Sequence, residues 1–209
     1  MRADANGQYV EVTADFRHYI DDPHVDPGFT RKPLTDEVDV VIVGGGFGGL
    51  LAAARLSEPG VKDIRIIEKG GDFGGTWYWN RYPGAQCDIE SYIYLPLLEE
   101  TGYVPKEKYS FGNEIRAHAR RTGEHFDLYR LACFQTEIRE MRWLQDENRW
   151  LITTSRGDAM RARFVVISSG PLNTRKRSAI ILSRRAGRSI ALASSRPPRQ
   201  RRASPAPPP

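Results

Sequence analysis

The sequence predicts an α/β fold in which helices cover a mostly parallel sheet and an antiparallel meander is inserted into it. A β-branched run, a glycine-rich turn and a helical pattern follow one another over residues 38–56, and a second apolar run occupies residues 64–67. This strand–helix–strand order within about 30 residues is typical of the βαβ unit of parallel sheets. Three later apolar runs, separated by short polar turns, indicate hairpins.

Composition divides the chain into three parts: an N-terminal arm (residues 1–36), a domain (residues 37–173) and a tail (residues 174–209). The arm is polar and irregular, and we expect it to pack on the domain surface through its apolar residues, which are Tyr9, Phe16, Tyr19, Ile20 and Phe29.

Within the domain, residues 38–43 form a continuous apolar run, which predicts a strand covered on both faces. A helix is expected over residues 50–56, ending near Pro59, and a buried strand over residues 64–67. Residues 70–105 hold too many Gly, Pro and aromatic residues for regular structure, and a loop of this length inside a domain is usually functional.

The second half of the domain predicts a helix over residues 113–131, with Asn113 as a candidate N-cap. The meander is expected over residues 134–143, 149–154 and 160–168. Its last run is apolar enough to re-enter the central sheet.

The tail contains ten Lys or Arg residues, six prolines and no Asp or Glu. With so little to bury, it is expected to be disordered. Its composition is also what a GC-rich gene yields when read out of frame, a hypothesis that sequencing of the locus tests. The rest of the chain carries 21 basic and 26 acidic residues, so the overall charge of +5 does not indicate a nucleic-acid partner.

Two cysteines, Cys87 and Cys133, form neither a disulfide framework nor a metal-ligand pattern, which favours a reducing, cytoplasmic location and no metal site. Cys87 is read as a small semi-buried residue, with a reactive thiol as the alternative. No apolar run reaches the roughly 18 residues that a membrane span needs, so no membrane partner is expected.

Gly44, Gly46 and Gly49 form the pattern G-x-G-x-x-G between the first strand and the first helix. These glycines allow a tight turn, a close approach to a pyrophosphate and close helix packing. Glu68 follows 24 residues after Gly44, at the end of the second strand, where a carboxylate can accept hydrogen bonds from a ribose. The pattern predicts a Rossmann-like dinucleotide site; the alternative is a glycine-rich turn with a surface glutamate.

A second glycine loop, GGTWYW at residues 74–79, is loaded with aromatic side chains. A tricyclic flavin needs walls on which to stack and polar groups around its edge, whereas a nicotinamide site needs no such loop here. The loop therefore indicates a flavin.

The stretches IVGGGFGGL, EKGGDFGGTWYWNRYPGAQCDIES and SSGPLN resemble the FAD-binding part of type I Baeyer–Villiger monooxygenases, the group of cyclohexanone and phenylacetone monooxygenases. The resemblance covers roughly residues 7–173 and implies a Rossmann-like FAD-binding domain. General flavin-containing monooxygenases share the glycine loop and GGTW but not the run WNRYPGAxCD.

The resemblance implies roles for individual residues. Gly44, Gly46 and Gly49 would hold the pyrophosphate of FAD and Glu68 its ribose, and the residues that would line or approach the flavin are Gly75, Thr76, Trp77, Trp79 and Tyr94. Ile138 would meet the adenine through its backbone. Asp88 would lie beside the flavin as the catalytic residue of this part. As alternatives, Asp88 caps the residues after it, and Trp77 and Trp79 are plain core aromatics.

The second glycine fingerprint, which binds NADPH in that family, does not follow SSGPLN, and no histidine stands in the family's linker signature. We therefore expect a truncated, incomplete domain that is inactive alone. The intact enzymes use NADPH and O2 to convert a ketone to an ester or lactone. The alternatives are a fragment of a flavin-containing N- or S-monooxygenase, and a non-catalytic FAD-binding remnant.

Overall fold

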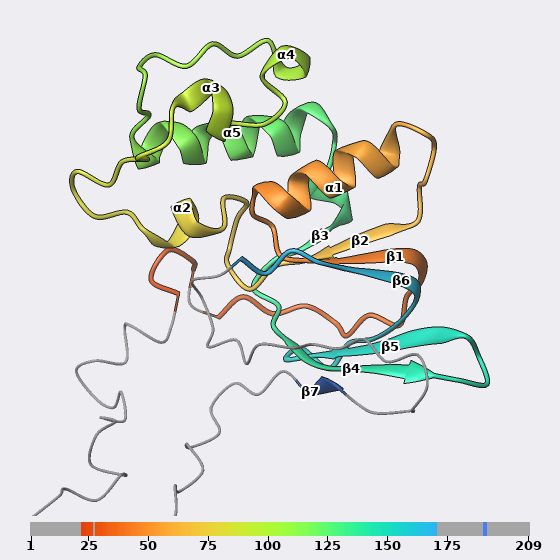
Figure 1. Ribbon diagram of the computed structural model, residues 1–209. Helices are drawn as coiled ribbons and strands as arrows, with labels where there is room; N and C mark the ends of the chain where they lie inside the picture. Colours follow the sequence, from red (N-terminus) through yellow and green to blue (C-terminus); the bar gives the residue numbers. More distant parts are fainter. Residues whose placement is uncertain (1–21, 27, 171–189, 192–209) are drawn as a thin grey trace, which may run out of the picture.

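The computed structural model describes residues 22–26, 28–170 and 190–191. They form a seven-stranded sheet in the order β3-β2-β1-β6-β5-β4-β7 (Figure 1). The predicted α/β class is confirmed, with one parallel and one antiparallel half.

The parallel half is centred on β1, which pairs with β2 on one side and β6 on the other. The strands are β1 (Glu37–Val43), β2 (Ile64–Ile67), β3 (Ala132–Cys133) and β6 (Ala159–Ile167). Val40 lies opposite Ile64 on one neighbour and Phe164 on the other. The run expected at residues 160–168 therefore does re-enter the central sheet.

The antiparallel half is the predicted meander, in which β6 pairs with β5 and β5 with β4. Its further strands are β4 (Ile138–Leu144), β5 (Arg149–Thr154) and β7 (Ile190–Ala191). Two residues of the tail, Ile190 and Ala191, pair with Met141 and Glu140 of β4. The other tail residues lie outside the described ranges.

The helices lie on one face of the parallel strands (Figure 1). The elements are α1 (Phe47–Ser57), α2 (Thr76–Trp79), α3 (Ser91–Tyr94), α4 (Leu98–Thr101), α5 (Gly112–His125) and the 3-10 turn η3 (Tyr129–Leu131). Residues 70–105 contain only single helical turns, in line with the irregular loop predicted there.

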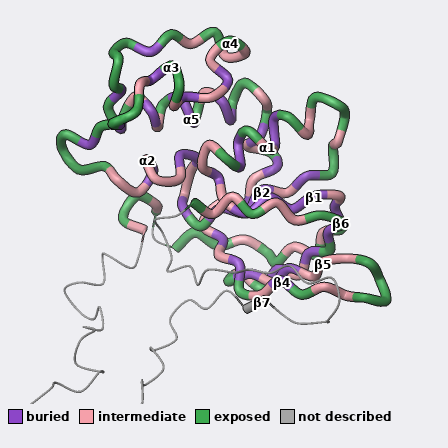
Figure 2. The backbone as a smooth tube through the Cα atoms, viewed as in Figure 1, coloured by how far each residue is buried: buried purple, intermediate pink, exposed green. Residues whose placement is uncertain are grey.

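Two apolar layers hold the sheet, because β-strand side chains alternate between its faces. Val40 and Ile42 point toward the helices and pack with Leu50 and Ala119. Val41 and Val43 point the other way and belong to the core cluster of the meander residues Ile138, Met141, Ile152 and Met160. In Figure 2 the buried positions follow β1 and β2 and the sides of α1 and α5 that face them.

The predicted helix over residues 113–131 is shorter than expected. Its N-cap is Phe111, and Asn113 lies inside the first turn, so the predicted asparagine cap is wrong. The helix ends at His125, and Asp127 follows with a left-handed backbone (φ 53°) that turns the chain toward η3.

The described part of the arm packs on the domain, as predicted. Arg31 pairs with Asp158 at 2.5 Å, and the amides of Ala159 and Arg161 donate to the carbonyls of Leu34 and Asp36. Phe29 is 44% exposed and lies under the guanidinium of Arg156. The other expected anchors, Tyr9, Phe16, Tyr19 and Ile20, lie outside the described residues. In the part of the chain that the structure describes, no helix is long and apolar enough to cross a membrane.

Candidate cofactor site

The carboxyl ends of the parallel strands meet at one edge of the sheet, where ligands of α/β proteins usually bind. The amide of Gly44, just past β1, donates to the carbonyl of Ile67. The amide of Ser168, just past β6, donates to Val43. These bonds bring the first glycine loop, Glu68 and the Ser168 turn to one place.

Two glycines of the first glycine loop, Gly44 and Gly49, have no room for a side chain. Gly44 has φ +104°, and a Cβ there would lie 2.6 Å from the carbonyl oxygen of Ser168. A Cβ on Gly49 would overlap the carbonyl oxygen of Gly44. Only glycine therefore fits at these two positions of the loop.

Helix α1 begins at this loop without a side-chain cap. Its N-cap is Gly46, no side chain caps it, and its first turn contains no acidic residue. Because the first amides of a helix lack partners within the helix, they can donate to an anion. The start of α1 can thus bind a phosphate group.

Glu68 is buried at the end of β2, with 6% of its surface exposed. Its two carboxylate oxygens accept hydrogen bonds from the amides of Gly45 (2.5 Å) and Gly70 (2.6 Å). Burial raises the pKa of Glu68, and these amide donors oppose the rise. Each carboxylate oxygen can accept a second hydrogen bond, so Glu68 can also receive the hydroxyls of a ribose.

The second glycine loop packs directly on the first. The amide of Gly74 donates to the carbonyl of Gly45 at 3.0 Å. Gly75 has φ +55°, and a Cβ there would lie 2.8 Å from the Cα of Gly46. This contact places Thr76, the first residue of α2, next to the start of α1.

Aromatic side chains join α1, α2 and α3 around this contact. The indole of Trp77 donates to the hydroxyl of Tyr94 at 2.7 Å. The ring of Phe47 meets that of Tyr94 edge-on, with centroids 5.9 Å apart. Trp79 is half-buried and packs edge-on against Tyr78. Trp77 also packs on the small core around Cys87 and Ile115, as the alternative reading of a core aromatic expected.

Asp88 lies at the exposed rim of the same group. It does not cap the following residues: the amide of Ile89 donates to the sulfur of Cys87, and the N-cap of α3 is Glu90. Burial is the main cause that raises the pKa of Tyr94, and the charge of Asp88 adds to it. The carboxylate is therefore close to the Trp77–Tyr94 pair and open to solvent.

Ile138 follows a segment that is hydrogen-bonded to the end of β2. The amides of Gln135 and Thr136 donate to the carbonyls of Gly70 and Glu68, both at 2.9 Å. Ile138 follows two residues later as the first residue of β4, with its side chain in the core. Its position suits a backbone contact with a group bound at Glu68.

Three residues near this site were missed by the sequence analysis. Phe47 occupies the variable position of the glycine pattern, Ser168 belongs to the SSG turn that Gly44 touches, and Tyr78 lies inside GGTWYW. All three lie within motifs that carried the signal, so their places near the site could have been predicted. No group of acidic, His and Cys residues suitable for a metal occurs among the described residues.

Comparison with known proteins places these features among flavin monooxygenases. Residues 42–101 match the family described as NAD(P)-binding Rossmann-like domain. The chain is 56% identical over 155 residues to a Baeyer–Villiger monooxygenase of Stachybotrys chlorohalonatus, covering 74% of this chain and 25% of that protein.

Solved structures show the same likeness. The polycyclic ketone monooxygenase of the fungus Thermothelomyces thermophila matches with a TM-score of 0.71 and 37% identity, over 81% of this chain and 30% of that one. The protein OTEMO, solved in complex with FAD and NADP, matches with a TM-score of 0.62 and 29% identity, over 67% of this chain and 27% of that one. The chain therefore spans 25 to 30% of the length of these proteins.

Proposed function

Because the chain belongs to the Baeyer–Villiger monooxygenases and spans a quarter to a third of the length of its relatives, we propose that it forms an FAD-binding part of such an enzyme. One observation carries the proposal. The buried carboxylate of Glu68 is hydrogen-bonded to the amide of Gly45, beside the uncapped start of α1. A ribose acceptor next to a phosphate-binding helix end is what a dinucleotide requires.

The site residues divide by the part of FAD that they would bind. Gly44, Gly46 and Gly49 would let the pyrophosphate approach the backbone, and Glu68, which accepts the amide of Gly45, would also accept the ribose hydroxyls. The backbone at Ile138 would meet the adenine. Residues of the second loop and of α3 would line the flavin, namely Gly75, Thr76, Trp77, Trp79 and Tyr94.

The complete enzyme would use NADPH and O2 to convert a ketone to an ester or lactone, with the flavin supplying the oxygen-transfer chemistry. The residues of this chain would hold the flavin and exclude water from one side of it. Asp88 would present its exposed carboxylate beside the flavin, free to pair with a cation outside the described residues. The 209 residues contain a single glycine fingerprint, so we expect FAD binding without NADPH oxidation. We further propose a cytoplasmic location, since both buried cysteines are free.

A direct test is to purify the chain and titrate it with FAD while recording the flavin absorbance and fluorescence. We expect a bound flavin and no NADPH consumption, with or without cyclohexanone. Failure to bind FAD would reject the proposal. Consumption of NADPH that depends on the ketone and yields the lactone would show instead that the chain is active alone.

Glu68→Ala tests the ribose role. Hydrogen bonds to a charged group contribute about 1.5 to 3 kcal/mol, so loss of this carboxylate should weaken FAD binding by roughly 10- to 100-fold. Glu58→Ala is the matched control, because Glu58 lies past the far end of α1 and, in the part of the chain that the structure describes, its side chain pairs with Arg55. Equal FAD affinity for the two variants would count against the assigned role.

A further inference from the structure

A single carboxylate of the arm holds the second glycine loop. Asp22 accepts a hydrogen bond from the hydroxyl of Tyr78 at 2.6 Å and from the amide of Gly71 at 3.1 Å, both at the same oxygen. Its other oxygen accepts the amide of His24 at 2.9 Å, which fixes the carboxylate on the arm itself. Tyr78 is 2% exposed, and it lies 56 residues from Asp22 in the chain.

These contacts continue to Glu68. A Cβ on Gly70 would lie 2.8 Å from the ring of Tyr78, so the ring lies directly against this glycine. The amide of Gly70 donates to Glu68, and Glu68 accepts the amide of Gly45 with its other oxygen. A continuous series of contacts therefore joins Asp22 to the first glycine loop.

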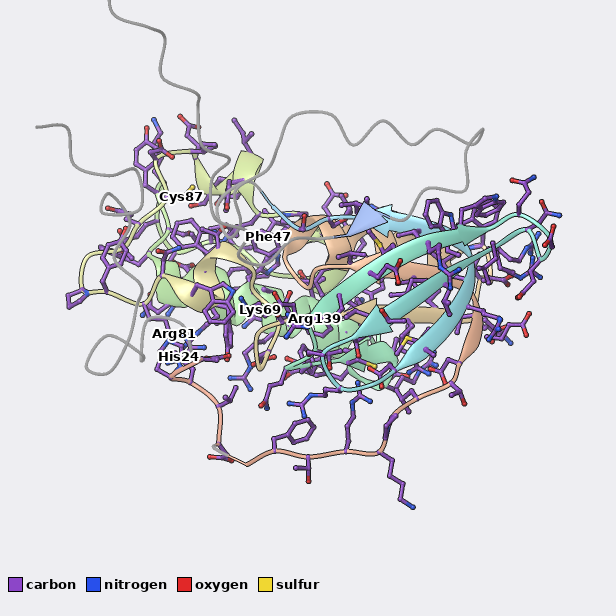
Figure 3. All side chains as sticks on the ribbon, turned by 90° about the horizontal axis from the view of Figure 1, so that it is seen from below. His24, Phe47, Lys69, Arg81, Cys87 and Arg139 are labelled. Atoms are coloured by element: carbon purple, nitrogen blue, oxygen red, sulfur yellow. The ribbon has the colours of Figure 1, made fainter. Side chains whose placement is uncertain are left out.

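Other arm residues also pack on the second glycine loop. His24 meets the ring of Tyr78 edge-on at 5.8 Å, and the guanidinium of Arg81 lies 4.5 Å from the centre of that ring. Figure 3 shows His24 and Arg81 beside each other. Val25 leaves no room for a side chain at Gly71. Residues 22–25 thus contact residues 70–81 through several side chains and not through Asp22 alone.

We propose that Asp22 is a positioning residue of the cofactor site: the docked arm holds Tyr78, Gly70 and Glu68 in the geometry that binds FAD. The inference rests on the proposed function. Because coupling between two binding events is reciprocal, FAD binding must also stabilise the docked arm. The pKa of Glu68 is consistent with a short distance between Asp22 and Glu68. Burial is the main cause that raises this pKa, and the negative charge of Asp22 raises it further.

The test compares FAD titrations of the wild-type chain with those of Asp22→Ala, Tyr78→Phe and the double variant. We expect Asp22→Ala to raise the Kd about tenfold and Tyr78→Phe about threefold, since the Gly71 amide still holds Asp22. The double variant should equal Asp22→Ala, because both changes remove the same contact. Asp22→Asn keeps the shape of the side chain and should lie between wild type and Asp22→Ala.

Asp158→Asn is the matched control, because it loosens the second attachment of the arm, at the turn between β5 and β6. It should lower stability and leave the Kd for FAD within twofold. Hydrogen exchange gives a second readout: FAD should slow exchange of the amides of residues 22–26 in the wild type but not in Asp22→Ala.

The outcomes separate the two proposals. A wild-type chain that does not bind FAD overturns the proposed function and this inference together. A wild-type chain that binds FAD, with an unchanged Kd in Asp22→Ala or unchanged exchange of the arm on adding FAD, overturns the inference alone. Equal losses of affinity in Asp22→Ala and Asp158→Asn would also reject it, because the effect would then follow general stability.

Discussion

At the scale of the residue, Asp158 forms a buried polar contact outside the cofactor site. Its side chain is fully buried and accepts hydrogen bonds from Arg31, from the hydroxyl of Thr154 and from the amide of Leu34. Burial alone would raise its pKa, but the hydrogen bonds outweigh burial and lower the pKa of Asp158 from 3.8 to about 2. This carboxylate joins the arm to the meander.

The lowered pKa predicts an acid dependence of stability. A carboxylate with a depressed folded pKa stabilises the fold above its unfolded pKa, and this contribution is lost as pH falls through the folded pKa. The difference between 3.8 and about 2 corresponds to about 2 kcal/mol, lost between roughly pH 4 and pH 2.

Asp158→Asn should therefore destabilise the chain by about 3 kcal/mol at pH 7, since it also leaves Arg31 without its partner. Urea unfolding at pH 7 and at pH 3 measures both effects. The variant should lose less stability than the wild type between these pH values, and equal losses would contradict the assignment.

At the scale of the element, the two glycine loops act as one unit because Gly75 lies against Gly46. Gly75→Ala should both strain the left-handed backbone (φ +55°) and push the loops apart. Gly84→Ala is the matched control, because Gly84 also has a positive φ (+80°) but has nothing within 4 Å of its Cβ position. Strain at such a position costs on the order of 1 kcal/mol.

Both variants should lose at least this much stability, and Gly75→Ala more because of its clash with Gly46, but only Gly75→Ala should weaken FAD binding, by tenfold or more. Thermal unfolding and FAD titration separate the two quantities. If both variants kept full affinity, the apposition of the loops would have no part in binding.

The elements also show what a sequence can predict. Apolar runs in the sequence predicted β1 and β2, because strands that are buried on both faces need such runs. Apolar runs separated by polar turns predicted the meander. The two-residue β3 did not, because Ala132 and Cys133 become a strand only by pairing with β2. The contact of Asp22 with Tyr78 was equally invisible, because 56 residues separate its partners. Local sequence patterns predicted the glycine loops and Glu68, whereas the positions of residues such as Asp22 depend on contacts between distant parts of the chain.

At the scale of the whole molecule, the excess of basic residues lies in the tail and not in the domain that carries the proposed FAD site. The chain has a net charge of +5, yet residues 174–209 hold ten basic and no acidic residues. Of these residues the structure describes Ile190 and Ala191, which pair with two residues of β4 at the edge of the sheet opposite to β3. The proposed FAD site lies at the carboxyl ends of β1, β2 and β6, and its contacts come from residues 22–168.

Removal of residues 174–209 should therefore reverse the net charge to −5 without changing the site. At 0.15 M salt we expect the Kd for FAD to stay within twofold, while the chain moves from cation-exchange to anion-exchange retention at pH 7. Near 10 mM salt the Debye length is about 30 Å, so the full chain should attract the anionic cofactor more strongly than the shortened one. A tenfold loss of affinity at 0.15 M salt would place part of the binding site in the basic tail, whereas a loss confined to low salt would show long-range attraction alone.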